Sequence, residues 1–128
     1  MTYIGRFAPS PSGPLHFGSL VAAVASYIDA KAHNGQWLVR IEDLDRPREI
    51  AGAATHILTT LDCFSLHWDG KVVYQSQRLA HYQEALQQLS QQRLIFHCNC
   101  SRQQLQQFPV YPGVCRHRQQ PKDSASAV

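Results

Sequence analysis

The sequence predicts an α/β fold built on a parallel sheet. Short segments rich in β-branched and aromatic residues alternate with longer segments whose apolar residues recur at helical spacing. Such alternation is typical of strand–helix–strand units, in which right-handed connections join parallel strands. A chain of 128 residues that is 44% hydrophobic and 16% charged can bury a real core, which excludes a wholly disordered protein.

The first strand–helix–strand unit spans residues 3–41. Tyr3–Ala8 is β-branched and aromatic and runs into a proline-rich loop, which indicates a strand followed by turns. Apolar residues recur at helical spacing over Phe17–His33, and Asn34-Gly35 supplies the left-handed stop that a helix end favours. Trp37–Ile41 is the second strand, and we expect it to pair in parallel with the first.

The remaining elements continue the alternation. Ser101 and Gln104 form a capping box that predicts a short helix reaching about Phe108. Cys63 and Phe64 are expected to be buried, Cys63 as a small hydrophobic residue. The other predicted elements are a helix over Ala51–Phe64, a strand over Val72–Tyr74, a helix over Gln77–Gln92 and a strand over Leu94–His97.

The carboxyl ends of the first two strands carry groups of opposite charge. In open α/β sheets, ligands bind beyond these strand ends. One end brings Arg6 and Ser10, and the other begins an acidic run at Glu42 and Asp43. An amphoteric ligand such as an amino acid suits this pairing, with its carboxylate on Arg6 and its ammonium on Glu42. The alternative is that Arg6 pairs with Glu42 or Asp43 and completes the sheet edge.

The helix after the proline-rich loop offers its N-terminus to the same crevice. Free backbone N–H groups and the positive end of the helix dipole favour phosphate there. Gly18 lets a flat ring or a phosphate approach the backbone, and His16 can donate to phosphate oxygens. For Arg46 and Arg48, contact with a nucleotide or RNA and a solvated face both remain open.

Three of the four cysteines lie close together near the C-terminus. Cys98, Cys100 and Cys115 fall within eighteen residues, and in a reduced cytosol such a cluster favours a metal site over disulfides. From the residues alone, His97 and His117 are the candidates for a fourth ligand, since imidazole commonly binds zinc. Packing is the usual role of a tyrosine such as Tyr111.

The loop and the acidic strand end together resemble a known signature. The string PSPSGPLHFG, from Pro9 to Gly18, looks like the ATP-binding signature of class I aminoacyl-tRNA synthetases in its glutamyl form. Arg6-Phe7-Ala8 and the run Arg40–Asp45 are similar to the glutamate pocket of that group. The resemblance therefore implies that the predicted sheet is the first half of a Rossmann-like synthetase domain, with a small zinc-binding insertion.

Within that class the chain resembles the glutamyl-queuosine tRNA(Asp) synthetases, a shortened branch of the glutamyl group. Cys98-Asn99-Cys100, Tyr111 and Cys115 are similar to the three thiolates and one tyrosine that bind zinc in the branch. The resemblance implies one structural Zn²⁺ per chain, held by these three cysteines and Tyr111. It also implies that ATP, with Mg²⁺, activates L-glutamate, which is then transferred to queuosine in the anticodon of tRNA(Asp).

The resemblance assigns a role to each matching residue. The catalytic positions are His16, Gly18 and Ser19, the last of which is often His in the class. The glutamate-binding residues are Arg6, Phe7, Ala8, Pro9, Ser10 and Glu42. The ATP-binding residues are Pro9, Ser10, Ser12, Gly13, His16 and Gly18.

The family pattern also includes a Lys-x-Ser-Lys type loop, and none of the three lysines, Lys31, Lys71 and Lys122, lies in one. We therefore expect an N-terminal portion that is inactive in isolation, with residues 1–96 as the first half of the catalytic domain, 97–118 as a zinc-binding subdomain and 119–128 as a flexible tail. One alternative is the N-terminal part of a glutamyl-tRNA synthetase. Another is a non-catalytic zinc-containing module that binds nucleotide or RNA.

Charge and hydropathy bear on partners and location. The net charge of +3 and pI of about 8.8 are compatible with a nucleic-acid partner. No apolar run approaches the ~20 residues of a membrane span, and the N-terminus lacks the pattern of a secretory signal. We expect a cytoplasmic protein that has no membrane partner and is a monomer when complete.

Overall fold

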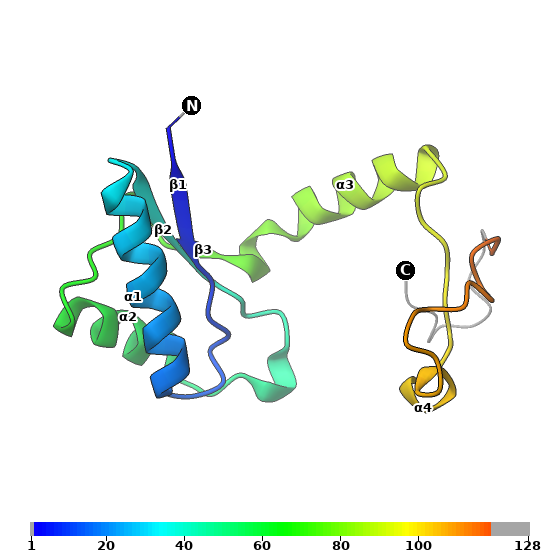
Figure 1. The fold of residues 1–128 in the computed structure, drawn as a ribbon, viewed down its shortest axis with the longest axis horizontal. Coiled ribbons are helices and arrows are strands. Elements are labelled where there is room, and N and C mark those ends of the chain that lie inside the picture. Colours follow the sequence, from blue (N-terminus) through cyan, green and yellow to red (C-terminus); the bar gives the residue numbers. More distant parts are fainter. Residues whose placement is uncertain (1, 119–128) are drawn as a thin grey trace. The chain divides into compact units, whose positions relative to one another are not determined.

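The computed structural model describes residues 2–118, so the expected flexible tail lies outside the described residues. Contacts divide the chain into two compact units, Met1–Leu79 and Ala80–Val128. Within the described part, every helix is too short or too polar to cross a membrane. The elements in chain order are β1 (Ile4–Phe7), α1 (Phe17–Ala32), β2 (Gln36–Ile41), the 3-10 turn η1 (Arg46–Arg48), α2 (Ala53–Cys63), β3 (Val73–Tyr74), the 3-10 turn η2 (Gln75–Arg78), α3 (Leu79–Gln91) and α4 (Arg102–Leu105) (Figure 1).

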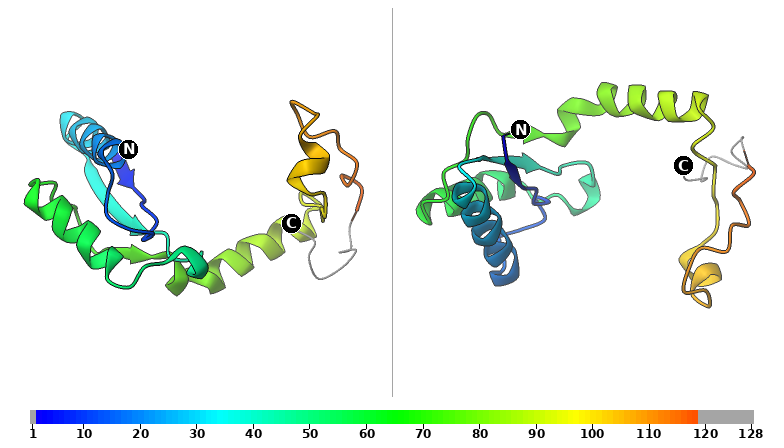
Figure 2. Two further views of the ribbon diagram at one scale, coloured as in Figure 1. Left: turned by 90° about the horizontal axis from the view of Figure 1, so that it is seen from below. Right: turned by 45° about the horizontal axis from the view of Figure 1, so that its top comes forward.

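The first unit is built on a three-stranded parallel sheet in the order β1-β2-β3. Arg6 of β1 pairs with Leu38 of β2, and Arg40 of β2 pairs with Val73 of β3. Helix α1 connects β1 to β2 and runs alongside them (Figure 2). Asn34 has φ of 49° directly after this helix, as its left-handed stop requires. The α/β fold with a parallel sheet is confirmed.

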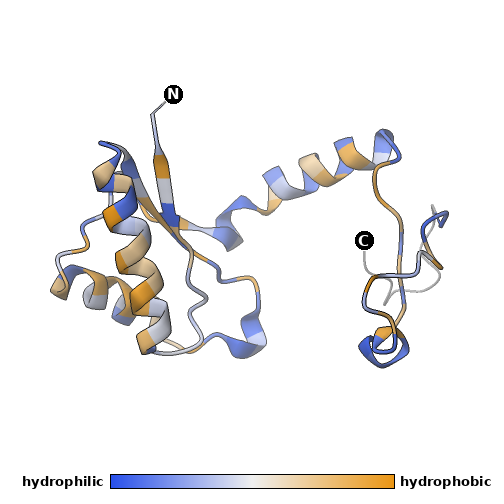
Figure 3. Cartoon of the chain, viewed as in Figure 1, coloured by the Kyte–Doolittle hydropathy of each residue, from blue (hydrophilic) through white to orange (hydrophobic). Residues whose placement is uncertain are grey.

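The core gathers around alternate residues of β2. Trp37, Val39 and Ile41 are at most 1% exposed, because side chains two apart on a strand share one face. The Trp37 indole Nε1 donates to the Ser26 hydroxyl of α1 at 2.9 Å, and the Tyr27 ring meets the indole edge-on at 5.3 Å. Apolar positions on β2, α1 and α2 contribute to the same core (Figure 3).

Glycine at position 5 allows β1 to lie directly against α1. A Cβ there would stand 2.9 Å from Ala30 Cβ and 3.1 Å from the Ser26 carbonyl oxygen. Gly35 is equally constrained, since its Cβ would lie 2.4 Å from the Tyr3 carbonyl oxygen. That oxygen accepts from the N–H of Gln36 at 2.9 Å, which aligns the start of β2 with β1.

Some predicted features of the helices are wrong. Helix α2 begins at Ala53 rather than Ala51, because Gly52 has φ of 80° and cannot continue a helix backward. Cys63 and Phe64 are exposed, Phe64 at 56%. Cys63 lies about 200° round the helix from buried Leu61, and Phe64 is the residue at which the helix has already ended.

The second unit carries helices with polar surfaces. None of the residues of α3 is buried, and glutamines and apolar residues alternate along it (Figure 3). The capping box at α4 is confirmed: Ser101 and Gln104 exchange hydrogen bonds of 2.8 and 3.2 Å. The helix ends at Leu105, before Phe108. The predicted strand over Leu94–His97 is wrong, because pairing in this segment is limited to one bridge at Cys98, beside which the His97 N–H donates to the Arg118 carbonyl at 3.1 Å.

Candidate functional site

The proline-rich loop after β1 is fixed to the segment that follows β2. The N–H of Glu42 donates to the Pro9 carbonyl at 3.0 Å, and the N–H of Ile50 donates to the Pro11 carbonyl at 2.9 Å. Pro11 itself is buried. These bonds bring the carboxyl end of β1 and the acidic end of β2 together, as parallel pairing predicts.

His16 forms the N-cap of α1. Its backbone is extended, at φ −80° and ψ 165°, and its Nδ1 accepts from the Ser19 N–H at 3.1 Å. Its Nε2 lies 3.0 Å from the Ser19 hydroxyl. Gly18 makes this ring position possible, since a Cβ there would stand 3.2 Å from His16 Cε1. The three predicted catalytic positions therefore contact one another at the start of α1.

The structure gathers most of the predicted ligand residues around one hollow. This hollow has a volume of about 540 Å³ and is lined by the loop and the first turns of α1. The predicted residues on its wall are Phe7, Ala8, Pro9, Ser10, Ser12, Gly13, His16 and Ser19. Gly18, Arg6 and Glu42 are outside this wall.

Arg6 and Glu42 do not pair with each other. The register of β1 and β2 sets Arg6 on the sheet face that also carries Arg40, because Arg6 pairs with Leu38 and Arg40 is two residues further on. Glu42 accepts a charge-assisted hydrogen bond of 2.6 Å from the Arg40 guanidinium. Arg6 is exposed, and within the described residues it has no ion pair. Pairing between Arg6 and Glu42 or Asp43, the structural alternative, is therefore not found.

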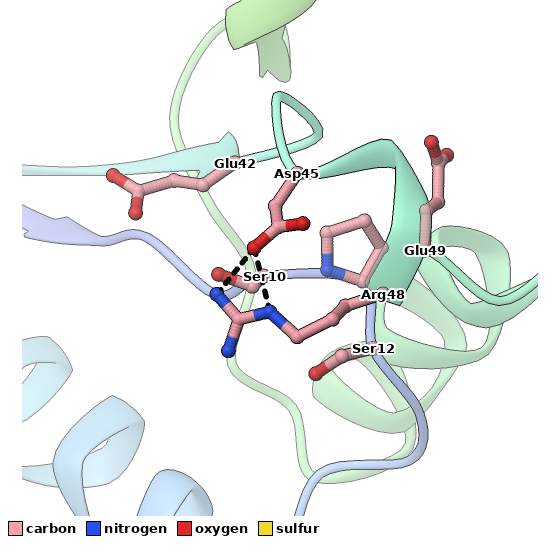
Figure 4. Close-up of a pocket in the computed structure, with 7 residues that line it drawn as sticks. Ser10, Ser12, Glu42, Asp45, Arg48 and Glu49 are labelled. Atoms are coloured by element: carbon pink, nitrogen blue, oxygen red, sulfur yellow. Dashed lines mark hydrogen bonds and ion pairs between the residues drawn. The ribbon is translucent and has the colours of Figure 1, made fainter. Parts of the chain in front are cut away.

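A second, much smaller pocket of about 10 Å³ lies between the loop and the segment after β2. Ser10, Ser12 and Glu42 line it (Figure 4). The Arg48 guanidinium lies beside Ser10 and binds Asp45, with Nε 2.6 Å and Nη2 2.5 Å from one carboxylate oxygen. The turn η1 brings Arg48 back to the carboxylate of Asp45, and the Arg48 side chain is 76% exposed, so this arginine lies on a solvated face beside the pocket.

Three thiols converge in the second unit. The sulfur atoms of Cys98, Cys100 and Cys115 all lie within 4.8 Å of one another, and those of Cys100 and Cys115 are 3.7 Å apart. The Tyr111 hydroxyl lies 3.7 Å from Cys98 Sγ and accepts from the Cys115 N–H at 2.9 Å. Among the described residues, no histidine belongs to this group. The three clustered thiols can bind a metal ion.

Mutual contacts shift the ionisation of this cluster. Hydrogen bonding with Cys98 and then Cys115 raises the pKa of the Cys100 thiol to about 11. Burial, followed by the contact with Cys115, raises the pKa of the Tyr111 hydroxyl. Hydrogen bonding from Tyr111 lowers the pKa of Cys115 despite its burial. Cys115 is thus the thiol that these contacts favour as a thiolate, the form that binds metals.

A known protein family matches nearly the whole chain, including the residues of this site. Residues 4–124 match the family of class I tRNA synthetases for E and Q, in its catalytic domain. The chain belongs to this family. Its three-stranded parallel sheet is accordingly part of the class I synthetase catalytic fold.

Curated relatives of this class I chain include two named Glutamyl-Q tRNA(Asp) synthetase. The one from Pectobacterium atrosepticum is 57% identical over 125 residues, which are 97% of this chain and 39% of the relative. The one from Serratia proteamaculans is 60% identical over 116 residues, 90% of this chain and 38% of the relative. The chain thus spans about two-fifths of the length of these relatives.

Solved structures of glutamate-tRNA ligases show the same arrangement. A glutamate-tRNA synthetase from Elizabethkingia anophelis superimposes with a TM-score of 0.72 at 28% identity, covering 84% of this chain and 23% of that one. A glutamate tRNA ligase from Elizabethkingia meningosepticum, in complex with its amino acid, has a TM-score of 0.71 with the same identity and coverage.

Two contacts at the acidic end of β2 were not predicted. Arg40 is bonded to Glu42, and the signal for this was their i, i+2 spacing at the end of a strand, which sets both side chains on one face. Asp43 accepts from the N–H and the hydroxyl of Ser76. No local pattern signals the second contact, because it joins residues 33 positions apart.

Proposed function

We propose that this chain is the N-terminal, ligand-binding part of a cytoplasmic, monomeric glutamyl-queuosine tRNA(Asp) synthetase. The whole enzyme would activate L-glutamate with ATP and transfer it to queuosine in the anticodon of tRNA(Asp). The observation that carries the proposal is the 57% identity, over 97% of this chain, to a relative of that name. The solved glutamate-tRNA ligases are more distant, at 28% identity.

In this proposal, Arg6, Ser10 and Glu42 bind L-glutamate, with the backbone of residues 7–9 forming the wall. Arg6 is exposed and carries no ion pair within the described chain, so its guanidinium is free for the substrate carboxylate. The Arg40 guanidinium donates a hydrogen bond to Oε1 of Glu42. The second carboxylate oxygen, Oε2, has no hydrogen-bond partner among the described residues, which suits it to an ammonium group.

The phosphates of ATP would lie at the start of α1, against Ser12, Gly13 and the cap formed by His16. The cap uses the N–H of Ser19 and leaves those of Phe17 and Gly18 without a partner in the described structure. As the glutamate carboxylate attacks the α-phosphorus, negative charge grows on the phosphate oxygens. Preorganised donors that meet this charge lower the barrier. Mg²⁺ accompanies ATP and neutralises part of its charge.

We also propose a structural Zn²⁺ bound by Cys98, Cys100, Cys115 and Tyr111, within a subdomain of residues 97–118 that follows the catalytic half, 1–96. Zinc–sulfur bonds of about 2.3 Å give a tetrahedron whose sulfur–sulfur edge is about 3.8 Å. The Cys100–Cys115 separation of 3.7 Å supports this geometry, and Tyr111 stands at 3.7 Å from Cys98. Four protein ligands leave no open position, which favours a structural role over a catalytic one.

A chimera tests the proposal. Residues 1–118 of this chain replace the matching part of the Pectobacterium relative, and the product is assayed for glutamylation of tRNA(Asp) with and without queuosine. We expect ATP- and glutamate-dependent labelling of the queuosine-containing tRNA alone. The unmodified relative is the positive control, and a His16→Ala chimera is the matched inactive control. A chimera that labels tRNA(Glu) instead would favour the second candidate, a glutamyl-tRNA synthetase.

A further inference from the structure

The three thiols near the C-terminus differ in what surrounds them. Cys100 Sγ and Cys115 Sγ face each other at 3.7 Å. Cys98 Sγ instead lies 3.7 Å from the Tyr111 hydroxyl and accepts from the Cys100 N–H at 3.5 Å. Tyr111 is itself held by the Cys115 N–H at 2.9 Å and by stacking on Phe96 at 5.6 Å. All three thiols interact, but Cys98 is held in addition by the Tyr111 hydroxyl and the Cys100 N–H, whereas the sulfur atoms of Cys100 and Cys115 face each other directly.

A disulfide requires sulfur atoms about 2.05 Å apart. From 3.7 Å, Cys100 and Cys115 reach that separation by a change of side-chain torsion, while Cys98 would first have to give up its contacts. We propose that the metal-free cluster is a thiol-oxidation site that forms a specific Cys100–Cys115 disulfide on reaction with a small-molecule disulfide such as oxidised glutathione. The disulfide itself is inferred from the thiol geometry. Only the expected competition between Zn²⁺ and oxidation rests on the proposed function.

The reaction is a double thiol–disulfide exchange. The Cys100 thiolate attacks one sulfur of the small disulfide, forms a mixed disulfide and expels the first small thiolate. The Cys115 thiolate then attacks Cys100 Sγ and expels the second. Two protein thiols are oxidised, one small disulfide is reduced to two thiols, and the two protons pass to the leaving thiolates. Cys100 meets the small disulfide first because it is half-buried, whereas Cys115 is only 4% exposed. The raised pKa of Cys100 makes this first step slow, and the lowered pKa of Cys115 favours the second step.

Metal binding and this disulfide exclude each other, because both need the Cys100 and Cys115 sulfurs. A bound Zn²⁺ protects the pair, and the disulfide removes two of the ligands. Oxidation would thus convert a site for a metal into a covalent link across residues 100–115. Cys63 is exposed and lies outside the cluster, so it serves as an internal reference for unselective oxidation.

The test treats the chelator-stripped chain with oxidised glutathione, then alkylates free thiols and maps peptides by mass spectrometry. We expect one intrachain disulfide between Cys100 and Cys115, with Cys63 and Cys98 alkylated. Cys63→Ser should form it at a rate within about twofold of the parent. Cys115→Ser should accumulate the glutathione adduct on Cys100. Saturating Zn²⁺ should slow the reaction at least about tenfold, since it depletes the metal-free form.

Mapping on the parent chain does not depend on how well any variant folds. A disulfide that joins Cys98 to Cys100 or to Cys115, or glutathione adducts with no intrachain disulfide, would overturn the inference. A chain that takes up no zinc, but closes the Cys100–Cys115 disulfide, would refute the zinc site and uphold the oxidation site. A chain that binds zinc yet gives another disulfide would do the reverse.

Discussion

Asp43 receives two hydrogen bonds from Ser76, one from the backbone N–H at 2.8 Å and one from the hydroxyl at 2.5 Å. They join the acidic segment after β2 to the first residues after β3. Burial raises the pKa of the Asp43 carboxyl, but the bonds from Ser76 outweigh that effect and leave the pKa below its ordinary value. Asp43, the residue next to Glu42, therefore fixes this end of β2 through its bonds to Ser76.

Removing the Asp43 carboxylate should destabilise the first unit. Hydrogen bonds to charged groups contribute about 1.5–3 kcal/mol, so we expect Asp43→Ala to lower the free energy of unfolding by about that amount. Ser76→Ala leaves the backbone bond and should cost less. Urea unfolding followed by tryptophan fluorescence measures both, with Asp62→Ala, an exposed position, as the control. Equal stability of all three variants would contradict the structural role of this pair.

Asp69 predicts a dependence of stability on pH. Its carboxylate accepts from the Trp37 N–H at 2.8 Å and from Lys31 Nζ at 2.9 Å, and these contacts, the backbone bond first, lower its pKa. The stabilisation is therefore complete above the ordinary pKa of about 3.9 and is lost as the pH falls through the lower folded value.

The comparison that checks this is Asp69→Asn against the parent, by urea unfolding at a series of pH values. At neutral pH we expect the variant to be less stable, and below the ordinary carboxyl pKa the difference should shrink. Asp62→Asn is the matched control, since Asp62 has only an exposed contact with His67. A difference between the parent and Asp69→Asn that is constant with pH would refute the assignment.

Zinc affinity separates Tyr111 from His97 as the fourth ligand. Tyr111→Phe removes the hydroxyl beside Cys98, and we expect zinc affinity to fall about tenfold or more. His97→Ala should leave the affinity unchanged, because His97 is outside the thiol group. The Cys98→Ser, Cys100→Ser double variant should bind no zinc. Elemental analysis and competition with a zinc chelator measure these effects. A larger loss of zinc affinity in His97→Ala than in Tyr111→Phe would show that the fourth ligand is the imidazole of His97.

Substrate contacts can be tested in the chimera with the Pectobacterium relative. Arg6→Ala and Glu42→Ala each remove a charge-assisted contact of about 1.5–3 kcal/mol, so we expect KM for glutamate to rise about tenfold to a hundredfold. His16→Ala should instead lower kcat for glutamate-dependent ATP–pyrophosphate exchange with a smaller effect on that KM. If the three variants show the same kinetic constants as the parent chimera, these roles are wrong.

Close packing at Gly5 gives a further stability test. Gly5→Ala places a methyl group 2.9 Å from Ala30 Cβ, between β1 and α1, and we expect a loss of about 1–3 kcal/mol from overpacking. Gly70→Ala is not a neutral control, because Gly70 has φ of 74°. Ala30→Gly in the Gly5→Ala background should recover part of the loss by making room, and no recovery would show that the cost arises elsewhere.

Local patterns were sufficient for the features that depend on neighbours in sequence. The helix start at His16, the stop at Asn34 and the capping box at Ser101 follow from single turns of chain. Cys63 could also have been placed correctly. It lies six residues after Ile57, or 240° further round the helix at 100° per residue, away from the buried face.

Features that need a distant partner could not be read from the sequence. Leu94–His97 has the residue types of a strand, but a strand also needs a partner along its length, and among the described residues that pairing is limited to the His97 N–H, which donates to the Arg118 carbonyl. The Asp43–Ser76 contact likewise depends on β2 and β3 being adjacent. In the thiol cluster, the geometry set Tyr111 beside Cys98, where residue frequencies alone favoured a histidine.

The capping role of His16 fixes where its proton resides. Because Nδ1 accepts from the Ser19 N–H, the neutral ring carries its hydrogen on Nε2, and that nitrogen faces the Ser19 hydroxyl. The serine oxygen thus occupies the position that a phosphate oxygen would need in order to accept from this imidazole. In the proposed function, nucleotide binding would be an exchange of one acceptor for another, in which a charged oxygen displaces a neutral one without any change in the helix itself.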